Sequence, residues 1–153
     1  MYTDVVICTG TYQKTLTSKI FAWIDIDCEI QAVPFAELST MQPGEPSSVI
    51  RERVIAARKI QEERFKSHKG IYCNAQMTER MLHQYAEPDA ASMEMLRMAM
   101  ERLKLSARAY SRILKVARTI ADLAGSEKVE SMHIAEAIGY RNLDRGDWAE
   151  RGI

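Results

Sequence analysis

Hydrophobic positions recur every three or four residues over most of the chain, from about residue 47 to residue 140. This spacing places them on one face of successive α-helices. The first third differs, because short β-branched runs occur at residues 5–7 and 24–33, and such runs favour strands. The pattern therefore predicts a mainly α fold, in which a five-helix bundle follows a short segment with one or two β-strands.

Helix boundaries follow from caps and breakers along this pattern. The predicted helices cover residues 47–70, 77–85, 89–104, 105–125 and 131–140. The first is expected to be the longest, with serine caps, an i, i+4 pair between Glu62 and Lys66, and Gly70 as its terminator. Ser131 is the expected N-cap of the last helix, which ends near Gly139.

Composition shifts divide the chain into four parts. A stretch rich in Pro, Gly, Ser and Thr separates the strand-like beginning from the helices, and a polar run follows them. The predicted parts are an N-terminal segment at 1–37, a linker at 38–46, a helical domain at 47–140 and a polar tail at 141–153.

The fourth predicted helix, residues 105–125, carries the clearest pattern. Ser106 is suited to cap its start and Gly125 to stop its end. Its predicted core-facing stripe consists of Ala109, Ile113, Val116, Ala117, Ile120 and Leu123. Cations at i, i+4 and i+7, namely Arg108, Arg112 and Lys115, form a second row along the edge of this stripe.

A solvated helix face is the ordinary explanation of such a row, and for Arg112 and Lys115 nothing in the sequence argues against it. Arg108 differs because it falls in the first turn, where the helix dipole disfavours a cation unless an anion is near. A phosphate would be such an anion, and a guanidinium can hold it bidentately. Arg108 is therefore the candidate anion-binding residue.

Charge and cysteine content limit the range of functions. Lys plus Arg and Asp plus Glu both count 21, so no overall field attracts nucleic acid or an acidic membrane. The three cysteines, Cys8, Cys28 and Cys73, form no CxxC pair. No apolar run reaches the roughly 18 residues of a membrane span and the N-terminus does not resemble a signal peptide. We expect a cytoplasmic protein with no membrane partner.

Catalytic and metal-binding motifs are not found. The phosphate-binding pattern GxxxxGK[ST] is absent, and no apolar run ends in paired acids as a Walker B strand does. Asp25 and Asp27 are alternate residues of a predicted strand, so both side chains would lie on the same face and could hold a metal. Solvated carboxylates at a strand edge are the ordinary explanation of such a pair. His68, His83 and His133 share no metal-site spacing. We therefore expect no catalytic residue, no metal site and no ATP hydrolysis by this chain alone.

Several long motifs resemble a known family. They are RERVIAARKIQEERF, GIYCNAQM, MAMERLKLSARAYSRILKVARTIADLAGSE and HIAEAIGYR. Together they look very like the C-terminal part of magnesium-chelatase-like AAA+ ATPases, and within these the competence-associated ComM type. The resemblance extends from about residue 24 to residue 144.

The resemblance implies that residues 47–140 are the helical lid of an AAA+ module, preceded by the last strand of its core at about residues 24–30. In such lids the SAR motif of the fourth helix carries the sensor 2 arginine, which reaches the γ-phosphate of ATP. By motif match this residue is Arg108. ATP and magnesium would then belong to the complete machine, and tight binding to this chain is not expected.

Partners are implied in the same way, since the family assembles into ATP-driven rings. The expected partner is an AAA+ core or a paralogous ATPase ring. ComM-type members are similar to DNA helicases that move branched recombination intermediates, whereas chelatase relatives insert metal into porphyrin. Before the last core strand the family usually reads SGPLLDRIDI, but this chain reads SKIFAWIDI, so Ala22 and Trp23 replace the expected Asp and Arg. This departure would remove a charge that stabilises phosphoryl transfer.

Our leading hypothesis is a non-catalytic lid fragment that contributes Arg108 to a nucleotide site completed by a core. The alternative is an autonomous DNA-binding or protein-interaction module that uses Arg108, Arg112 and Lys115 together with Arg53 and Arg64. A third, structural adaptor role would require docking on an intact AAA+ ring.

Overall fold

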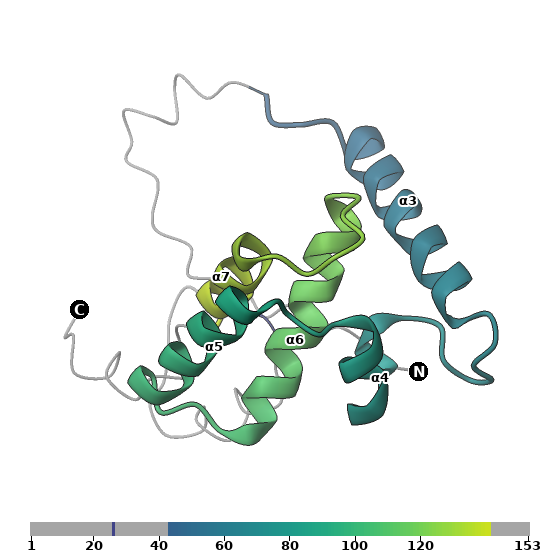
Figure 1. Cartoon of the computed structure of the whole chain (residues 1–153). Coiled ribbons are helices and arrows are strands. Elements are labelled where there is room, and N and C mark those ends of the chain that lie inside the picture. Colours follow the sequence, from purple (N-terminus) through teal and green to yellow (C-terminus); the bar gives the residue numbers. More distant parts are fainter. Residues whose placement is uncertain (1–25, 27–42, 142–153) are drawn as a thin grey trace, which may run out of the picture.

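The computed structural model describes Ile26 and residues 43–141 of the 153-residue chain (Figure 1). This part is helical and contains no strand, as predicted for residues 47–140. Its elements are α3 (Ser47–Phe65), the 3-10 helix η1 (Asn74–Gln76), α4 (Glu79–Tyr85), α5 (Ala90–Arg102), α6 (Ala107–Leu123) and α7 (Ser131–Gly139). Several predictions concern residues outside the described part and stay open. They involve the predicted strands, the Asp25 and Asp27 pair, Ala22 and Trp23, Cys8 and Cys28, and residues 142–153.

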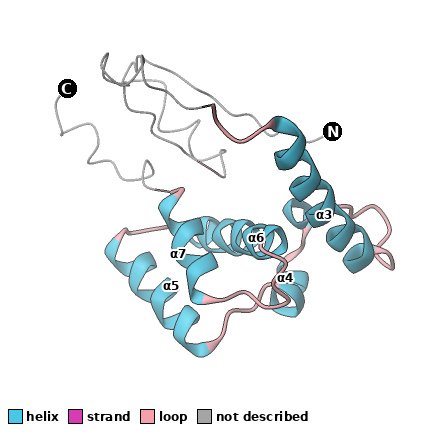
Figure 2. Cartoon of the chain, turned by 90° about the horizontal axis from the view of Figure 1, so that it is seen from above, coloured by secondary structure: helices cyan, strands magenta, loops and turns pink. Residues whose placement is uncertain are grey.

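Helix α6 is the centre of the described fold. Helices α5 and α7 lie on one side of it and α3 and α4 on the other, as Figures 1 and 2 show. The core is apolar and receives a fully buried side chain from each of four helices. These side chains are Leu82 of α4, Leu96 of α5, Ile113 of α6 and Ile134 of α7.

Three details predicted for the first and last helices are wrong. The first helix ends at Phe65 and not at Gly70, because the Lys66 N–H donates to the Glu63 carbonyl at 3.4 Å and the chain then turns. The N-cap of α7 is Glu130 and not Ser131, because the Nδ1 atom of His133 accepts a hydrogen bond from the backbone N–H of Glu130 at 3.0 Å. Lys66 contacts Glu63 at 3.4 Å instead of the predicted Glu62, because it lies just beyond the end of α3.

The predicted ends of α6 are confirmed. The Ser106 hydroxyl accepts a hydrogen bond from the Ala109 N–H at 3.3 Å. At the other end Gly125 has a φ of 70°, and the N–H of Ser126 donates to the carbonyl of Ala121 at 2.8 Å. This is a Schellman motif, in which a left-handed residue directly after the helix lets the last carbonyls find donors.

The buried face of α6 is wider than predicted and is displaced around the helix. Ala109, Ile113 and Ala117 are buried as expected, but Val116 and Ile120 are only half-buried and Leu123 is exposed. The additional buried residues are Leu114, Arg118, Ala121 and Asp122. Two of these carry charge, so they could not be assigned to a core from hydrophobic periodicity.

The turn between α5 and α6 contains a strained lysine. Lys104 has a φ of 51°, and the Leu105 N–H donates to the Met100 carbonyl at 3.0 Å. Lys104 thus occupies the left-handed position that glycine favours at a helix end.

We expect Lys104→Gly to raise the free energy of unfolding by up to about 1 kcal/mol, because glycine removes the steric cost of this conformation. Gly125→Ala should lower it by roughly 1–2 kcal/mol for the converse reason. Urea unfolding of both variants, with Gly44→Ala as a control at a site without positive φ, measures the two effects. A destabilised Lys104→Gly variant would contradict this interpretation.

Candidate functional site

Arg108 is exposed in the first turn of α6, directly after the Ser106 cap. A side chain in this position extends from the end of the helix where backbone N–H groups lack intrahelical acceptors. The positive end of the helix dipole and the guanidinium then act on the same region of space. The described geometry is therefore compatible with an anion bound at Arg108.

Arg112 and Lys115 continue along the same edge of α6, and both are half-buried. The Nζ atom of Lys115 donates a hydrogen bond to the backbone carbonyl of Ala75 at 3.0 Å. Lys115 thus ties α6 to η1, which is a structural contact. Arg108 is the most exposed of the three cations in this row.

Arg53 and Arg64, which the alternative hypothesis adds to this edge, are engaged elsewhere. Arg53 forms two hydrogen bonds of 3.0 Å with the carboxylate of Glu45. Arg64 contacts both carboxylate oxygens of Asp122, at 2.5 and 2.7 Å. The described structure therefore does not extend the basic row of α6 through these two arginines.

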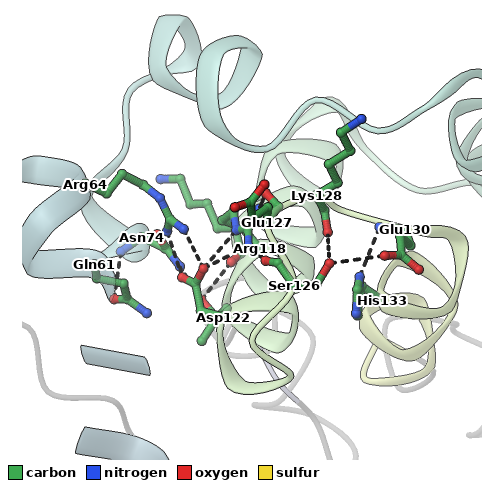
Figure 3. A network of polar contacts seen from close by, with 12 residues as sticks. Gln61, Arg64, Asn74, Arg118, Asp122, Ser126, Glu127, Lys128, Glu130 and His133 are labelled. Atoms are coloured by element: carbon green, nitrogen blue, oxygen red, sulfur yellow. Dashed lines mark hydrogen bonds and ion pairs between the residues drawn. The ribbon is translucent and has the colours of Figure 1, made fainter. Parts of the chain in front are cut away.

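A buried polar network joins the C-terminal ends of α3 and α6 (Figure 3). Asp122 is at its centre and has a fully buried side chain. It accepts hydrogen bonds from Arg64, from the Asn74 side-chain amide at 2.7 Å and from the Nε atom of Arg118 at 3.0 Å. Two guanidinium groups and one amide thus surround a single carboxylate.

Arg118 also closes the turn that follows α6. Its Nη1 atom donates to the carbonyl of Glu127 at 2.8 Å and its Nη2 atom to that of Ser126 at 2.5 Å. The Arg118 side chain is 2% exposed, so its guanidinium group lies in the interior. Arg118 therefore connects the network to the segment that leads into α7.

The electrostatics of the network favour an ionised carboxylate. Burial raises the pKa of Asp122, but hydrogen bonds from Arg64 and Asn74 and the charge of Arg118 oppose this and hold it below its usual range. Burial lowers the pKa of Arg118, the charge of Asp122 raises it, and nearby Arg64 lowers it further. The net direction for Arg118 is downward.

Sequence reasoning did not identify this network, although one signal was present. Arg118 and Asp122 stand at i and i+4 within the predicted fourth helix, a spacing that supports ion pairs. Arg64 lies 58 residues from Asp122, and no local pattern reveals that contact.

His68, His133 and the described cysteine have structural surroundings, whereas His83 is exposed on α4. The His68 ring lies edge-on to Phe65 and Tyr85, at centroid distances of 6.3 and 6.0 Å, and His133 is buried at the start of α7. Cys73 is half-buried, with its Sγ atom 3.6 Å from Gln76. Among the described residues, no group of three His, Cys, Asp or Glu side chains is arranged to hold a metal. None of the described helices is long and apolar enough to cross a membrane.

Comparison with known proteins places these features in a family. The family described as "Magnesium chelatase, subunit ChlI C-terminal" matches residues 44–141. The competence protein ComM of Haemophilus influenzae is 37% identical over 90% of this chain, which corresponds to 28% of ComM. The uncharacterized protein YifB of Escherichia coli is 36% identical over 90% of this chain and 26% of its own length. The chain thus spans about a quarter of the length of these relatives.

Proposed function

Because this chain belongs to the family of magnesium chelatase ChlI C-terminal domains, we propose that it acts as the helical lid of an AAA+ ATPase. In this role it supplies Arg108 as a sensor 2 arginine to ATP held with magnesium by a core. The single observation that carries the proposal is the position of Arg108, an exposed residue in the first turn of the central helix. A phosphate there would face both a fork of N–H donors and the positive helix end.

In this proposal Arg108 holds only a phosphate group, and the rest of the nucleotide is held by the core. Arg108 can bind phosphate oxygens, and the Ser106 cap fixes the first turn of α6 from which it extends. ATP supplies the bond that is broken, while Arg108 holds and senses the terminal phosphate. We therefore propose that the chain is not catalytic alone and acts with an AAA+ core or a paralogous ATPase ring, in the cytoplasm.

The surface of α3 supports a larger assembly. Val49, Ile50 and Val54 in its N-terminal half are 41–45% exposed, and apolar side chains gathered on one helix are typical of surfaces that bind protein. An ATPase core is the partner that the family suggests. For the complete machine we propose a role in DNA recombination or branch migration, as the likeness to ComM suggests.

The alternative of an autonomous DNA-binding module receives less support. Arg53 and Arg64 are held by Glu45 and Asp122, and the formal net charge is zero. Salt-dependent binding of branched or single-stranded DNA by the isolated chain would favour this alternative, because phosphate contacts release counterions.

The proposal is tested by adding the chain to a ComM-type ATPase from which the corresponding lid has been deleted. We expect no ATP turnover by the chain alone and stimulated turnover by the mixture. Arg108→Ala should reduce this stimulation about 10- to 100-fold, because a charge-assisted hydrogen bond to phosphate is lost. Lys128→Ala, which removes an exposed cation after α6, is the matched control.

Two outcomes would contradict the proposal. One is an equal loss of stimulation in Arg108→Ala and Lys128→Ala. The other is turnover by the purified chain alone that disappears in Arg108→Ala, since this would make the chain an enzyme.

A further inference from the structure

Helix α3 is much less buried than the central helix of the fold. Only Ala57, Gln61 and Phe65 of its 19 residues are buried, and its first ten residues are all exposed. In Figures 1 and 2 it lies at the periphery, across α6 from α5. Within the described residues α3 packs mainly against α6 and forms hydrogen bonds with Asn74 of η1. Little apolar contact therefore holds α3 in place.

The apolar part of this contact is concentrated at the C-terminal end of α3. Phe65 is 2% exposed, and its ring lies edge-on to Tyr85 of α4 at a centroid distance of 5.8 Å. Ala57 is the other buried apolar residue of the helix. Beyond Ala57 toward the N-terminus no residue of α3 is buried. Phe65 is therefore the main apolar anchor.

The rest of the contact is polar and directional. Arg64 binds both oxygens of Asp122 and also donates to the Asn74 side chain at 2.8 Å. The Gln61 side chain accepts from the Asn74 backbone N–H at 3.3 Å. We name Gln61, Arg64, Asn74 and Asp122 the latch. Such hydrogen bonds depend steeply on geometry, so a small movement of α3 weakens them together.

A turn suited to a hinge follows directly. α3 ends at Phe65, and η1 begins only at Asn74. Between them Gly70 has a φ of 85° and no atom within 4 Å of the position that a Cβ would occupy. Glycine can change its backbone angles at low steric cost. The segment 66–73 can therefore change direction at Gly70, and Ile71 is its hydrophobic residue that packs partly against the core.

We propose that α3 is a detachable arm, which leaves α6 as one unit when the latch opens and pivots on residues 66–73 while α4–α7 stay folded. The bundle can persist because α6 and α7 pack extensively on each other, as do α5 and α7. Asp122 also retains Arg118 and Asn74 as partners after Arg64 leaves. Movement of the arm would change the direction in which residues 43–46, which precede α3, leave the bundle. This inference does not depend on a nucleotide at Arg108.

Native-state hydrogen exchange of the 153-residue chain tests the arm. We expect the amides of residues 51–63 to exchange at least about tenfold faster than those of residues 113–121. Their exchange should depend little on urea, because local opening exposes little surface. Equal rates and equal urea dependence in α3 and α6 would overturn the proposal, because the two helices would then open only together.

A latch variant provides a second readout. Arg64→Lys keeps the charge but loses the bidentate contact, so exchange in α3 should accelerate about tenfold while exchange in α6 changes less than twofold. Lys59→Met, which removes an exposed cation of α3 outside the latch and the hinge, should change neither. Equal acceleration in α3 and α6 after Arg64→Lys would also overturn the proposal.

Discussion

Replacing Asp122 with Ala is expected to lower the free energy of unfolding by roughly 3–5 kcal/mol, the cost typical of removing one partner from a buried ion pair. The Asp122 carboxylate is the anion that Arg64 and Arg118 share, and its loss leaves these two arginines close together with side-chain exposures of 12% and 2%. Two guanidinium groups that shared one counter-charge would then repel each other. Urea unfolding followed by far-UV circular dichroism measures this loss.

Glu63→Ala is the matched control for this experiment. Glu63 also pairs with a cation, at 3.4 Å from Lys66, but both side chains are about three-quarters exposed. Exposed pairs contribute less than about 1 kcal/mol. A loss below 1 kcal/mol in Asp122→Ala would show that the network is not a major stabilising feature.

The pH dependence of stability gives an independent check on Asp122. Its pKa is lowered in the folded protein, so its contribution is present above its unfolded pKa of about 4 and is lost as pH falls through the folded value. The difference in stability between the wild-type chain and Asp122→Asn should therefore shrink below about pH 4. A difference that is constant from pH 7 to pH 3 would mean that folding does not lower the pKa of Asp122.

Local patterns were sufficient to predict the helices and most of their ends. Ser106 and Gly125 act through bonds within a few residues, so their roles can be deduced from the sequence around them. The helical spacing of hydrophobic residues likewise predicted α4, α5 and α7 from their own sequences. The family resemblance, confirmed by the match over residues 44–141, rests on similar local motifs.

The buried face of α6 could not be predicted in this way, because it depends on a distant helix. Arg118 and Asp122 look like solvent-facing residues until Arg64 and Asn74 approach from α3 and η1. Because these partners form hydrogen bonds with the two charged side chains, the face of α6 that carries Arg118 and Asp122 is buried, and Leu123 is left exposed. The role of Arg108 is different, since its proposed ligand is not part of the described chain and only the motif suggested it.

Replacing Arg118 with Met is the second change for which we expect a large effect. It should lower the free energy of unfolding by roughly 2–4 kcal/mol, because buried hydrogen bonds and one partner of a buried ion pair are lost. Methionine keeps much of the apolar stem but leaves the carbonyls of Ser126 and Glu127 without their donor. It also removes one counter-charge of Asp122, although Arg64 remains. Arg80→Met, which removes an exposed cation from α4, should stay within about 0.5 kcal/mol of the wild-type chain.

A double replacement distinguishes a charge network from independent contacts. Asp122→Leu combined with Arg118→Met replaces the central ion pair by apolar side chains, and such pairs are often tolerated better than either single change. The combined loss should therefore be smaller than the sum of the single losses by at least about 1 kcal/mol. Strict additivity would mean that Arg118 acts only by closing the turn after α6, and that its contact with Asp122 at 3.0 Å contributes nothing to stability.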